Sequence, residues 1–408
     1  MASIKPFNIA VPDSDLERLK KKLSDTTFPQ DVDFSDSWDY GAPLKDIKRL
    51  ATFWQNGYDW RKAEAKLNAE LPQFTTSIAV EGFDNIQVHF VHQKATRPDS
   101  IPLLFCHGWP GSFLEVVKIL PLLANPFDSN QPSFHVVAPS LPNFGFSGKV
   151  TKKGFGPPHH AEVCHKLMLQ LGYEEYVTQG GDWGYIITRL MALNYPKHVL
   201  ATHLNFVRVS KPPTFTAAPT QYLKHAMLPY SAEEKAGLDR TQWFMKKGYG
   251  YNLEQSTRPH TLGFGLADSP VALLAWIYEK LHDWTDSYPW TDEEILTWIS
   301  IYAFSTAGPD ASVRIYYENY NNGGYEQGGQ YIANIPLGLS YFPKDLVVPP
   351  STWGRTLGPV VFEKRHNDGG HFAAYERPEK LAEDLRTMFG KQGGAESIVK
   401  KLKTQSKI

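Results

Sequence analysis

Gly180-Gly181-Asp182-Trp183-Gly184 is the stretch of this 408-residue sequence that decides the fold. It follows an apolar run, Tyr176-Val177-Thr178, and precedes a helical pattern with Ile187, Leu190 and Met191 on one face. Small residues around one central side chain, between a strand and a helix, are typical of a strained turn that exposes that side chain. Glycines are needed because a bulkier residue would keep the backbone from approaching so closely. The stretch therefore predicts a nucleophile elbow with Asp182 at its tip.

An aspartate at this tip favours one class of reaction. A serine nucleophile suits acyl substrates, whereas a serine that attacked an sp³ carbon would form an ether with no carbonyl for water to attack. A carboxylate that attacks an sp³ carbon forms an ester, which water can cleave. Asp182 therefore indicates an alkylating electrophile as the substrate. The alternative is that Asp182 only caps the following helix, where its side chain would accept hydrogen bonds from free amides.

The elbow lies within a longer pattern of strands and helices. From about Gly82 onward, short apolar runs alternate with helical segments, which predicts an α/β fold with a mostly parallel sheet covered on both faces. The predicted strands are Ile86 to Val91, Ile101 to Cys106, Phe134 to Ala138, Tyr176 to Gln179, Leu200 to Phe206, Leu337 to Tyr341 and Pro359 to Phe362.

Between residues 207 and 335 the strand pattern stops, and capping boxes at Ser231 and Thr291 begin helices instead. Asn319 to Gln330 is predicted to be a Gly/Asn-rich loop. A helical block inserted into an α/β sheet indicates a lid over an active site. The predicted segments are an N-terminal helical meander (1–80), the first part of an α/β-hydrolase core (81–206), the helical lid (207–335), the second part of the core (336–395) and a basic C-terminal tail (396–408).

His107-Gly108-Trp109-Pro110-Gly111 directly follows the predicted strand that ends at Cys106. In this fold, a loop after an early strand supplies one oxyanion-hole amide, and the residue after the nucleophile supplies the other. The backbone amides of Trp109 and Trp183 are therefore the predicted oxyanion hole. A tight turn with no chemical role is the alternative interpretation of His107 to Gly111.

His371 is the predicted base that activates water. It lies in Gly369-Gly370-His371-Phe372, between the last strand and the last helix, and a nucleophile followed by a late histidine is the chain order of this fold. Asp345 follows a strand and precedes His371, so it is predicted to orient the imidazole. An exposed loop aspartate is the alternative for Asp345.

Opening a strained ether leaves an alkoxide, which a tyrosine phenol can hydrogen-bond and protonate. The predicted lid contains many tyrosines, and their spacing does not choose among them.

Together these residues resemble the microsomal-type epoxide hydrolases, particularly their soluble fungal members. Asp182, Asp345 and His371, the His-Gly-Trp-Pro turn and the lid carry the resemblance, which covers nearly the whole chain. Further matches to motifs of that family are Tyr58-Asp59-Trp60-Arg61, Glu64, Leu67-Asn68 and Pro72-Gln73-Phe74 in the meander, and Ser140-Leu141-Pro142-Asn143-Phe144-Gly145-Phe146-Ser147, in which Asn143 and Phe144 depart from the pattern.

The resemblance implies a cofactor-independent and metal-free epoxide hydrolase whose partners are a small-molecule epoxide and water. It implies a covalent ester on Asp182, cleaved by water that His371 and Asp345 activate, with a vicinal diol as product. It also maps the family's two ring-opening tyrosines onto Tyr251 and Tyr316. Their neighbours Tyr249 and Tyr317 leave a register error open.

Two alternatives remain open from the residues. A haloalkane or haloacid dehalogenase shares the aspartate nucleophile and the following tryptophan, but it cradles a halide, often with Asn where this chain has Trp109. A catalytically inactive binding protein could keep the fold, although it would not need Asp182, Asp345 and His371 together.

Composition excludes several other classes. A formal net charge of -1 provides no basic surface for nucleic acid, and Cys106 and Cys164 form neither a disulfide framework nor a zinc pattern. Neither a signal peptide nor a run near the ~20 apolar residues of a membrane helix is present, so we expect a cytoplasmic protein without membrane insertion. Ser406-Lys407-Ile408 is similar to the Ser-Lys-Leu peroxisomal address, which leaves a peroxisomal location open. The meander leaves a homodimer open.

Overall fold

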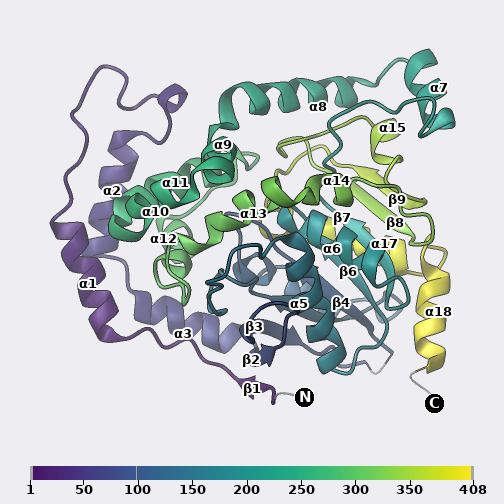
Figure 1. The fold of residues 1–408 in the computed structure, drawn as a ribbon, viewed down its shortest axis with the longest axis horizontal. Coiled ribbons are helices and arrows are strands. Elements are labelled where there is room, and N and C mark those ends of the chain that lie inside the picture. The colour runs from purple at the N-terminus through teal and green to yellow at the C-terminus, as the bar shows by residue number, and fades with distance from the viewer. Residues whose placement is uncertain (1–2, 98, 406–408) are drawn as a thin grey trace.

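A single mixed β-sheet runs through the computed structural model, which describes residues 3–97 and 99–405 (Figure 1). The strands are ordered β1-β2-β3-β5-β4-β6-β7-β8-β9. The pairings β1–β2, β2–β3 and β3–β5 are antiparallel, and those from β5 to β9 are parallel. The strands are β1 Lys5–Pro6, β2 Gln73–Ile78, β3 Ile86–Gln93, β4 Ile101–Cys106, β5 Phe134–Pro139, β6 Tyr176–Gly180, β7 Val199–Leu204, β8 Leu337–Tyr341 and β9 Val360–Arg365.

The central parallel strands end at the same level. Cys106 of β4 pairs with Gly180 of β6, and Gly180 pairs with Leu204 of β7. Leu204 in turn pairs with Leu339 of β8. Because these strands are parallel, the loops that follow them leave the sheet at one edge. Side chains placed just after β4, β6, β7 and β8 are therefore brought together.

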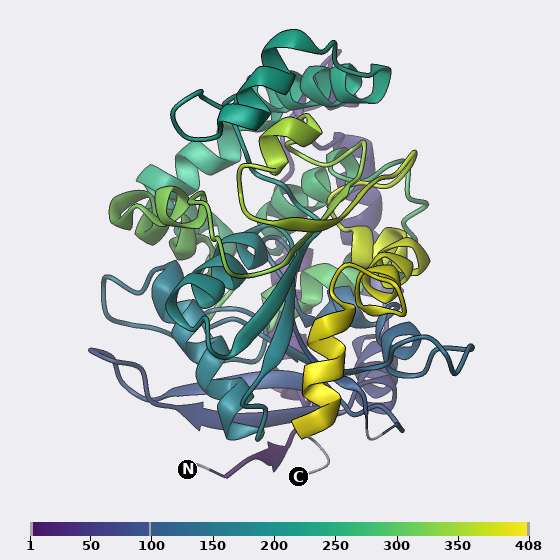
Figure 2. The same ribbon diagram turned by 90° about the vertical axis from the view of Figure 1, so that its right-hand side faces the viewer.

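Helices cover the two faces of this sheet, and the central strands are almost wholly buried. Figure 2 shows α5 (Pro157–Gln170) and α6 (Trp183–Asn194) on one side of the strands and α17 (Pro378–Phe389) and α18 (Glu396–Gln405) on the other. The predicted α/β fold with a mostly parallel sheet is confirmed. The remaining core helices are η2 Phe113–Val116, α4 Leu120–Ala124, α15 Ser351–Gly354 and α16 Ala373–Glu376.

A block of helices between β7 and β8 lies above the sheet in Figure 1. Both predicted capping boxes form: the side chains of Ser231 and Thr291 accept hydrogen bonds from the amides of Glu234 and Glu294. The helices of this lid are α7 Pro219–Met227, α8 Ala232–Trp243, the π-helix η3 Phe244–Gly248, α9 Gly250–Thr257, α10 Pro259–Asp268, α11 Pro270–Asp283, α12 Asp292–Ala303, η4 Ala311–Val313, α13 Arg314–Asn322 and α14 Gly324–Gly328.

Within the described residues, no helix on its own is long and apolar enough to cross a bilayer. The helices α10 and α11 meet that test only as a pair, and the pair is bent by 115°.

The N-terminal helices pack on the lid. Both α1 and α2 contact α11, while α2 and α3 contact α12. Arg49 forms an ion pair with Asp292, at the start of α12. The hydroxyls of Tyr58 and Thr297 lie 2.9 Å apart. The meander therefore braces the lid of its own chain. Its helices are α1 Asp13–Ser24, η1 Trp38–Tyr40, α2 Leu44–Asn56 and α3 Trp60–Glu70.

The first 80 residues are not only helix and turn, as the sequence predicted. They also contain β1 and β2, and β2 pairs along its whole length with β3 in antiparallel register, from Gln73 opposite Val91 to Ile78 opposite Ile86. The prediction was wrong here because β2 is stabilised by a partner strand that follows it, which a reading of local periodicity misses.

Two other segments predicted to be irregular are helical. Asn319 to Gln330, predicted as a loop, contains the end of α13, a left-handed Gly323 with φ of 66°, and α14. Part of the predicted tail, 396–408, forms α18, because Val399 is buried on its inner face and α18 packs on α17. Ser406-Lys407-Ile408 lies outside the described residues.

Candidate active site

Asp182 lies in a strained turn between β6 and α6. Its φ is 49° and its ψ is -121°, a left-handed backbone that side-chain-bearing residues rarely adopt. It occupies the N-cap position of α6, yet its side chain caps no helix amide. The capping alternative is therefore wrong. Strain of this kind persists where the surrounding structure holds a side chain for a function.

Close packing around this turn explains its small residues. A Cβ atom at Gly184 would lie 2.0 Å from the carbonyl oxygen of Cys106, and one at Gly108 would lie 2.2 Å from Asp182 Oδ1. Both distances are far below van der Waals contact. The elbow and the His107–Gly111 loop can therefore touch only because both positions lack a side chain.

The two oxygens of Asp182 face different partners. Oδ1 accepts a hydrogen bond of 2.7 Å from the backbone amide of Trp109, one of the two predicted oxyanion donors. Oδ2 lies 3.3 Å from Nε2 of His371. Trp183, the other predicted donor, is the first residue of α6, where a backbone amide has no partner within its own helix.

His371 and Asp345 lie beside this carboxylate, each just after a strand. Nδ1 of His371 is 2.6 Å from Asp345 Oδ1, which also accepts a hydrogen bond of 2.7 Å from the amide of Leu346. The amide of His371 donates to the carbonyl of Trp284, so the loop itself is anchored. Both His371 and Asp345 are buried. The structure thus places Asp345, His371 and Asp182 in one line of contacts.

The charge of His371 depends on these neighbours. Burial alone would lower the pKa of His371, but the carboxylates of Asp345 and Asp182 outweigh burial and raise that pKa to about 10. At neutral pH the imidazole is therefore protonated. It can accept a proton only after one of those charges is removed.

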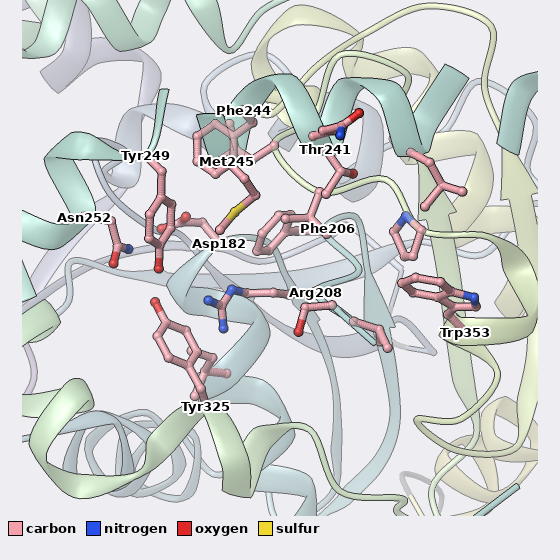
Figure 3. Close-up of a pocket in the computed structure, with 18 of the residues that line it drawn as sticks. Asp182, Phe206, Arg208, Thr241, Phe244, Met245, Tyr249, Asn252, Tyr325 and Trp353 are labelled. Atoms are coloured by element: carbon pink, nitrogen blue, oxygen red, sulfur yellow. The ribbon is translucent and has the colours of Figure 1, made fainter. Parts of the chain in front are cut away.

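Above Asp182 is a cavity of about 540 Å³ enclosed between the sheet and the lid (Figure 3). That volume is typical of small-molecule sites. Its lining is largely apolar and aromatic and comprises Asp182, Trp183, Ile186, Phe206, Arg208, Val209, Ser210, Leu238, Asp239, Thr241, Gln242, Phe244, Met245, Tyr249, Tyr251, Asn252, Tyr316, Tyr325, Leu346, Val347, Pro349 and Trp353.

Tyr251 of α9 and Tyr316 of α13 both line this cavity. The ring of Tyr251 stacks on Trp109 at a centroid distance of 5.4 Å, and the ring of Tyr316 meets Trp183 edge-on at 4.6 Å. The two tyrosine rings are 5.8 Å apart. Burial, with the nearby charge of Asp182, raises the pKa of both phenols well above 10, so both remain hydrogen-bond donors. Among the described residues, the Tyr316 hydroxyl has no partner of ordinary hydrogen-bond geometry.

The two neighbouring tyrosines differ in position. Tyr249 also lines the cavity, whereas Tyr317 is absent from its wall. Figure 3 shows Tyr249 facing Tyr325 across the cavity, with Asn252 beside it. The cavity therefore contains more phenols than the pair that the sequence resemblance selects.

Two ionisable residues near the site were missed by sequence analysis. Glu115, in η2, has a carboxyl oxygen only 1.7 Å from where a Cβ of Gly111 would lie, and burial raises its pKa to about 8. Arg208 lines the cavity four residues after β7. The only signals for them in the sequence were an acidic residue soon after the His-Gly-Trp-Pro turn and a basic residue soon after a strand. No group of three or more His, Cys, Asp or Glu in the described chain is arranged to hold a metal ion.

The chain is similar to epoxide hydrolases along most of its length. Residues 4–116 match the family described as epoxide hydrolase N terminus, and residues 101–221 match the family described as alpha/beta hydrolase fold. A putative epoxide hydrolase of Stigmatella aurantiaca is 39% identical, across 95% of this chain and 84% of that protein. Epoxide hydrolase 1 of Sus scrofa is 35% identical, across 95% of this chain and 89% of that protein.

Two solved structures share the architecture. Aspergillus niger epoxide hydrolase is 36% identical and superposes with a TM-score of 0.80, covering 94% of this chain and 95% of that one. Juvenile hormone epoxide hydrolase from the silkworm Bombyx mori is 28% identical with a TM-score of 0.86, covering 99% of this chain and 96% of that one.

Proposed function

Since the chain belongs to the epoxide hydrolase family, we propose that Asp182 opens the ring of a small-molecule epoxide by direct attack of its carboxylate. The protein is an epoxide hydrolase, which sets aside the dehalogenase and the inactive binding protein that the residues alone left open. The roles of individual residues in that reaction are our proposal.

In the first step, Oδ2 of Asp182 attacks an oxirane carbon. The carbon–oxygen bond of the ring breaks, and its electron pair goes to the ring oxygen. Oδ1 is the oxygen held by the Trp109 amide, so it becomes the carbonyl oxygen of the new ester. Tyr251 and Tyr316 donate hydrogen bonds to the ring oxygen, and one of them supplies its proton. The unpartnered hydroxyl of Tyr316 supports this role.

In the second step, water cleaves the ester. Alkylation removes the negative charge of Asp182, which is one of the charges that raise the pKa of His371. The pKa of His371 therefore falls, and its imidazolium passes a proton through solvent to the phenolate that the first step left. The neutral imidazole, still oriented by Asp345, can then deprotonate a water molecule. The hydroxide attacks Cγ of Asp182, and the amides of Trp109 and Trp183 stabilise the resulting oxyanion. Breakage of the Cγ–Oδ2 bond expels an alkoxide, which takes the proton held by His371 and leaves as the vicinal diol. The new carboxyl group of Asp182 then returns its proton to His371.

The observation that carries this proposal is the strained Asp182, with one oxygen at an amide donor and the other at His371. A single turnover in oxygen-18 water tests it. The label should enter the Asp182 carboxylate, while the first diol carries an unlabelled carboxylate oxygen. A fully labelled first diol would mean that water attacks the ring directly.

Three further expectations from the sequence stay predictions. A homodimer has no support beyond the exposed surface of the meander, where the rings of Phe34 and Tyr40 stack in solvent. The peroxisomal address depends on residues 406–408, and the cytoplasmic location depends on composition alone.

A further inference from the structure

Arg208 is a cation in the wall of the cavity that contains Asp182. It follows β7, at the edge of the sheet where the catalytic groups gather. Its side chain is half-buried, and the guanidinium lies 3.6 Å from the centroid of the Tyr325 ring. In Figure 3 the side chain extends toward Tyr249 and Tyr325, on the Asp182 side of the cavity. Stacking on Tyr325 limits the directions in which the guanidinium can point.

The guanidinium of Arg208 makes no hydrogen bond or ion pair with any residue in the described ranges. Two other arginines of the chain differ from Arg208 in this respect. Arg189 donates to the backbone oxygens of Gly328 and Gln330, and Arg240 donates to those of Asp345 and Asp283. A planar guanidinium has five N–H donors, and leaving them unpaired away from water is costly. Arg208 therefore has donors available for a ligand.

The acids nearest the cavity do not satisfy this cation. The Asp182 carboxylate faces the Trp109 amide and His371, and neither of its oxygens is within ion-pair distance of Arg208. Asp239 also lines the cavity but is exposed on α8 and forms no ion pair with Arg208. The carboxylate of Asp182 in the cavity wall would repel an anionic substrate, and the cation of Arg208 offsets that repulsion.

Resting on the proposed function, we propose that Arg208 binds a carboxylate carried by the epoxide substrate. A carboxylate matches the guanidinium fork with two parallel hydrogen bonds. The cavity of about 540 Å³ accommodates a molecule much larger than an oxirane. The oxirane lies at Asp182, the carboxylate lies at the guanidinium on the same side of the cavity, and the apolar lining contacts the carbon chain between them. The preferred substrates are thus amphipathic epoxy acids.

Matched substrates separate this role from catalysis. Terminal epoxides with an ω-carboxylate, in a series of increasing chain length, are compared with their methyl esters in the wild type and in Arg208→Gln. The readout is the acid-to-ester ratio of kcat/KM. That ratio should fall by about 10- to 100-fold in Arg208→Gln at the best chain length. Arg208→Lys keeps the charge but loses the guanidinium fork. Its acid-to-ester ratio should lie between those of the wild type and Arg208→Gln.

Lys211→Gln is the matched control, because it removes one positive charge from an exposed position outside the cavity wall. It should leave the acid-to-ester ratio unchanged. Arg208→Glu should reverse the preference, so that an ω-amino epoxide is hydrolysed better than the acid. Calorimetric binding of the diol acid measures the same contact without turnover, and its affinity should fall in Arg208→Gln by a similar factor.

Several results would overturn the inference. An acid-to-ester ratio that Arg208→Gln leaves unchanged would remove Arg208 from substrate recognition. An equal loss for acid and ester would mean that Arg208 only positions Tyr325. If the wild type hydrolysed neither substrate but bound the diol acid through Arg208, the proposed function would fail while the anion site stood. Equal binding by wild type and Arg208→Gln would overturn the site itself.

Discussion

The two halves of the active site hold their chemical groups in different ways. At the edge of the sheet, Asp182, His371 and Asp345 contact one another directly, at 3.3 and 2.6 Å. In the lid, Tyr251 and Tyr316 are held by ring packing, and the Tyr316 hydroxyl makes no hydrogen bond of ordinary geometry with any described residue. The sheet therefore presents groups that already satisfy each other, whereas the lid presents phenols whose proposed partner is the substrate.

This difference follows from what each half is built on. The sheet groups come directly after strands whose ends are aligned by backbone hydrogen bonds, so their spacing is set by register. The lid tyrosines come from two separate helices, α9 and α13, which contact each other in a lid that the meander braces through α11 and α12. Mutations of His371 and Asp345 should therefore affect the fate of the ester, and mutations of the lid tyrosines should affect its formation.

The largest effect is expected for His371→Gln. Alkylation of Asp182 stays possible, but without a base the ester is not hydrolysed, so steady turnover should fall by about 10⁴-fold or more. Mass spectrometry should find the enzyme heavier by the mass of one epoxide. Asp182→Ala should never form that adduct.

His366→Gln is the matched control for His371→Gln. His366 also forms a buried pair with an aspartate, but that aspartate is Asp384, whereas His371 lies beside the nucleophile Asp182. This variant should lose stability without accumulating the adduct. Rapid steady turnover by His371→Gln would remove His371 from the role of base.

The next effect is expected for Asp345→Asn. It removes the largest charge that raises the pKa of His371 and weakens the bond that orients the imidazole. Ester hydrolysis should slow by roughly 10³- to 10⁴-fold, with alkylation much less affected. Single-turnover measurements of the two steps test this split. Asp239→Asn, which removes an exposed carboxylate from the cavity wall, should leave both steps near wild-type rates.

Single substitutions in the lid should have smaller effects. Tyr251→Phe and Tyr316→Phe each remove one donor to developing charge, a bond of about 1.5–3 kcal/mol, so alkylation should slow roughly ten- to more than hundredfold. Hydrolysis of the ester should change little. The double variant should be nearly inactive, because no predicted phenol remains to protonate the oxygen. Stopped-flow tryptophan fluorescence can follow alkylation.

Tyr317→Phe is a better control for these variants than Tyr249→Phe, because Tyr249 lines the cavity and Tyr317 does not. Tyr317→Phe should alkylate normally. If it lost alkylation while Tyr316→Phe kept it, the assignment on α13 would be off by one residue.

The smallest effect is on stability at alkaline pH. The pKa of His371 is raised from 6.5 to about 10, so the folded state holds this proton more tightly than the unfolded chain does. The stabilising contribution is complete below pH 6.5 and is lost as the pH rises through about 10. The pKa of the buried phenols of Tyr251 and Tyr316 is raised above 10, so their contribution to stability is lost only at higher pH.

Melting temperatures of the wild type and His371→Gln across this pH range test the contribution of His371 to stability. The difference between the two proteins should shrink between about pH 6.5 and 10. A difference that stayed constant across that range would mean that His371 is neutral in the resting enzyme.

Much of the sheet follows from the sequence. Two predicted strands, Ile101 to Cys106 and Leu337 to Tyr341, agree with the structure residue for residue, because buried parallel strands are short apolar runs with clear ends. The strand β2 was missed because its half-buried residues need β3 to pair with. The helix α18 was missed because one buried face is a weak signal in a lysine-rich stretch.

The sequence by itself determined the kind of chemistry, because an aspartate between small residues at a strand–helix turn is a local feature. Only the tertiary structure decided which side chains that aspartate meets. The charge of His371 depends on two carboxylates distant in sequence, and the availability of Arg208 depends on which groups fail to reach it. Distances between remote residues and the exclusion of water set those properties, and both arise only when the sheet and the lid enclose one cavity.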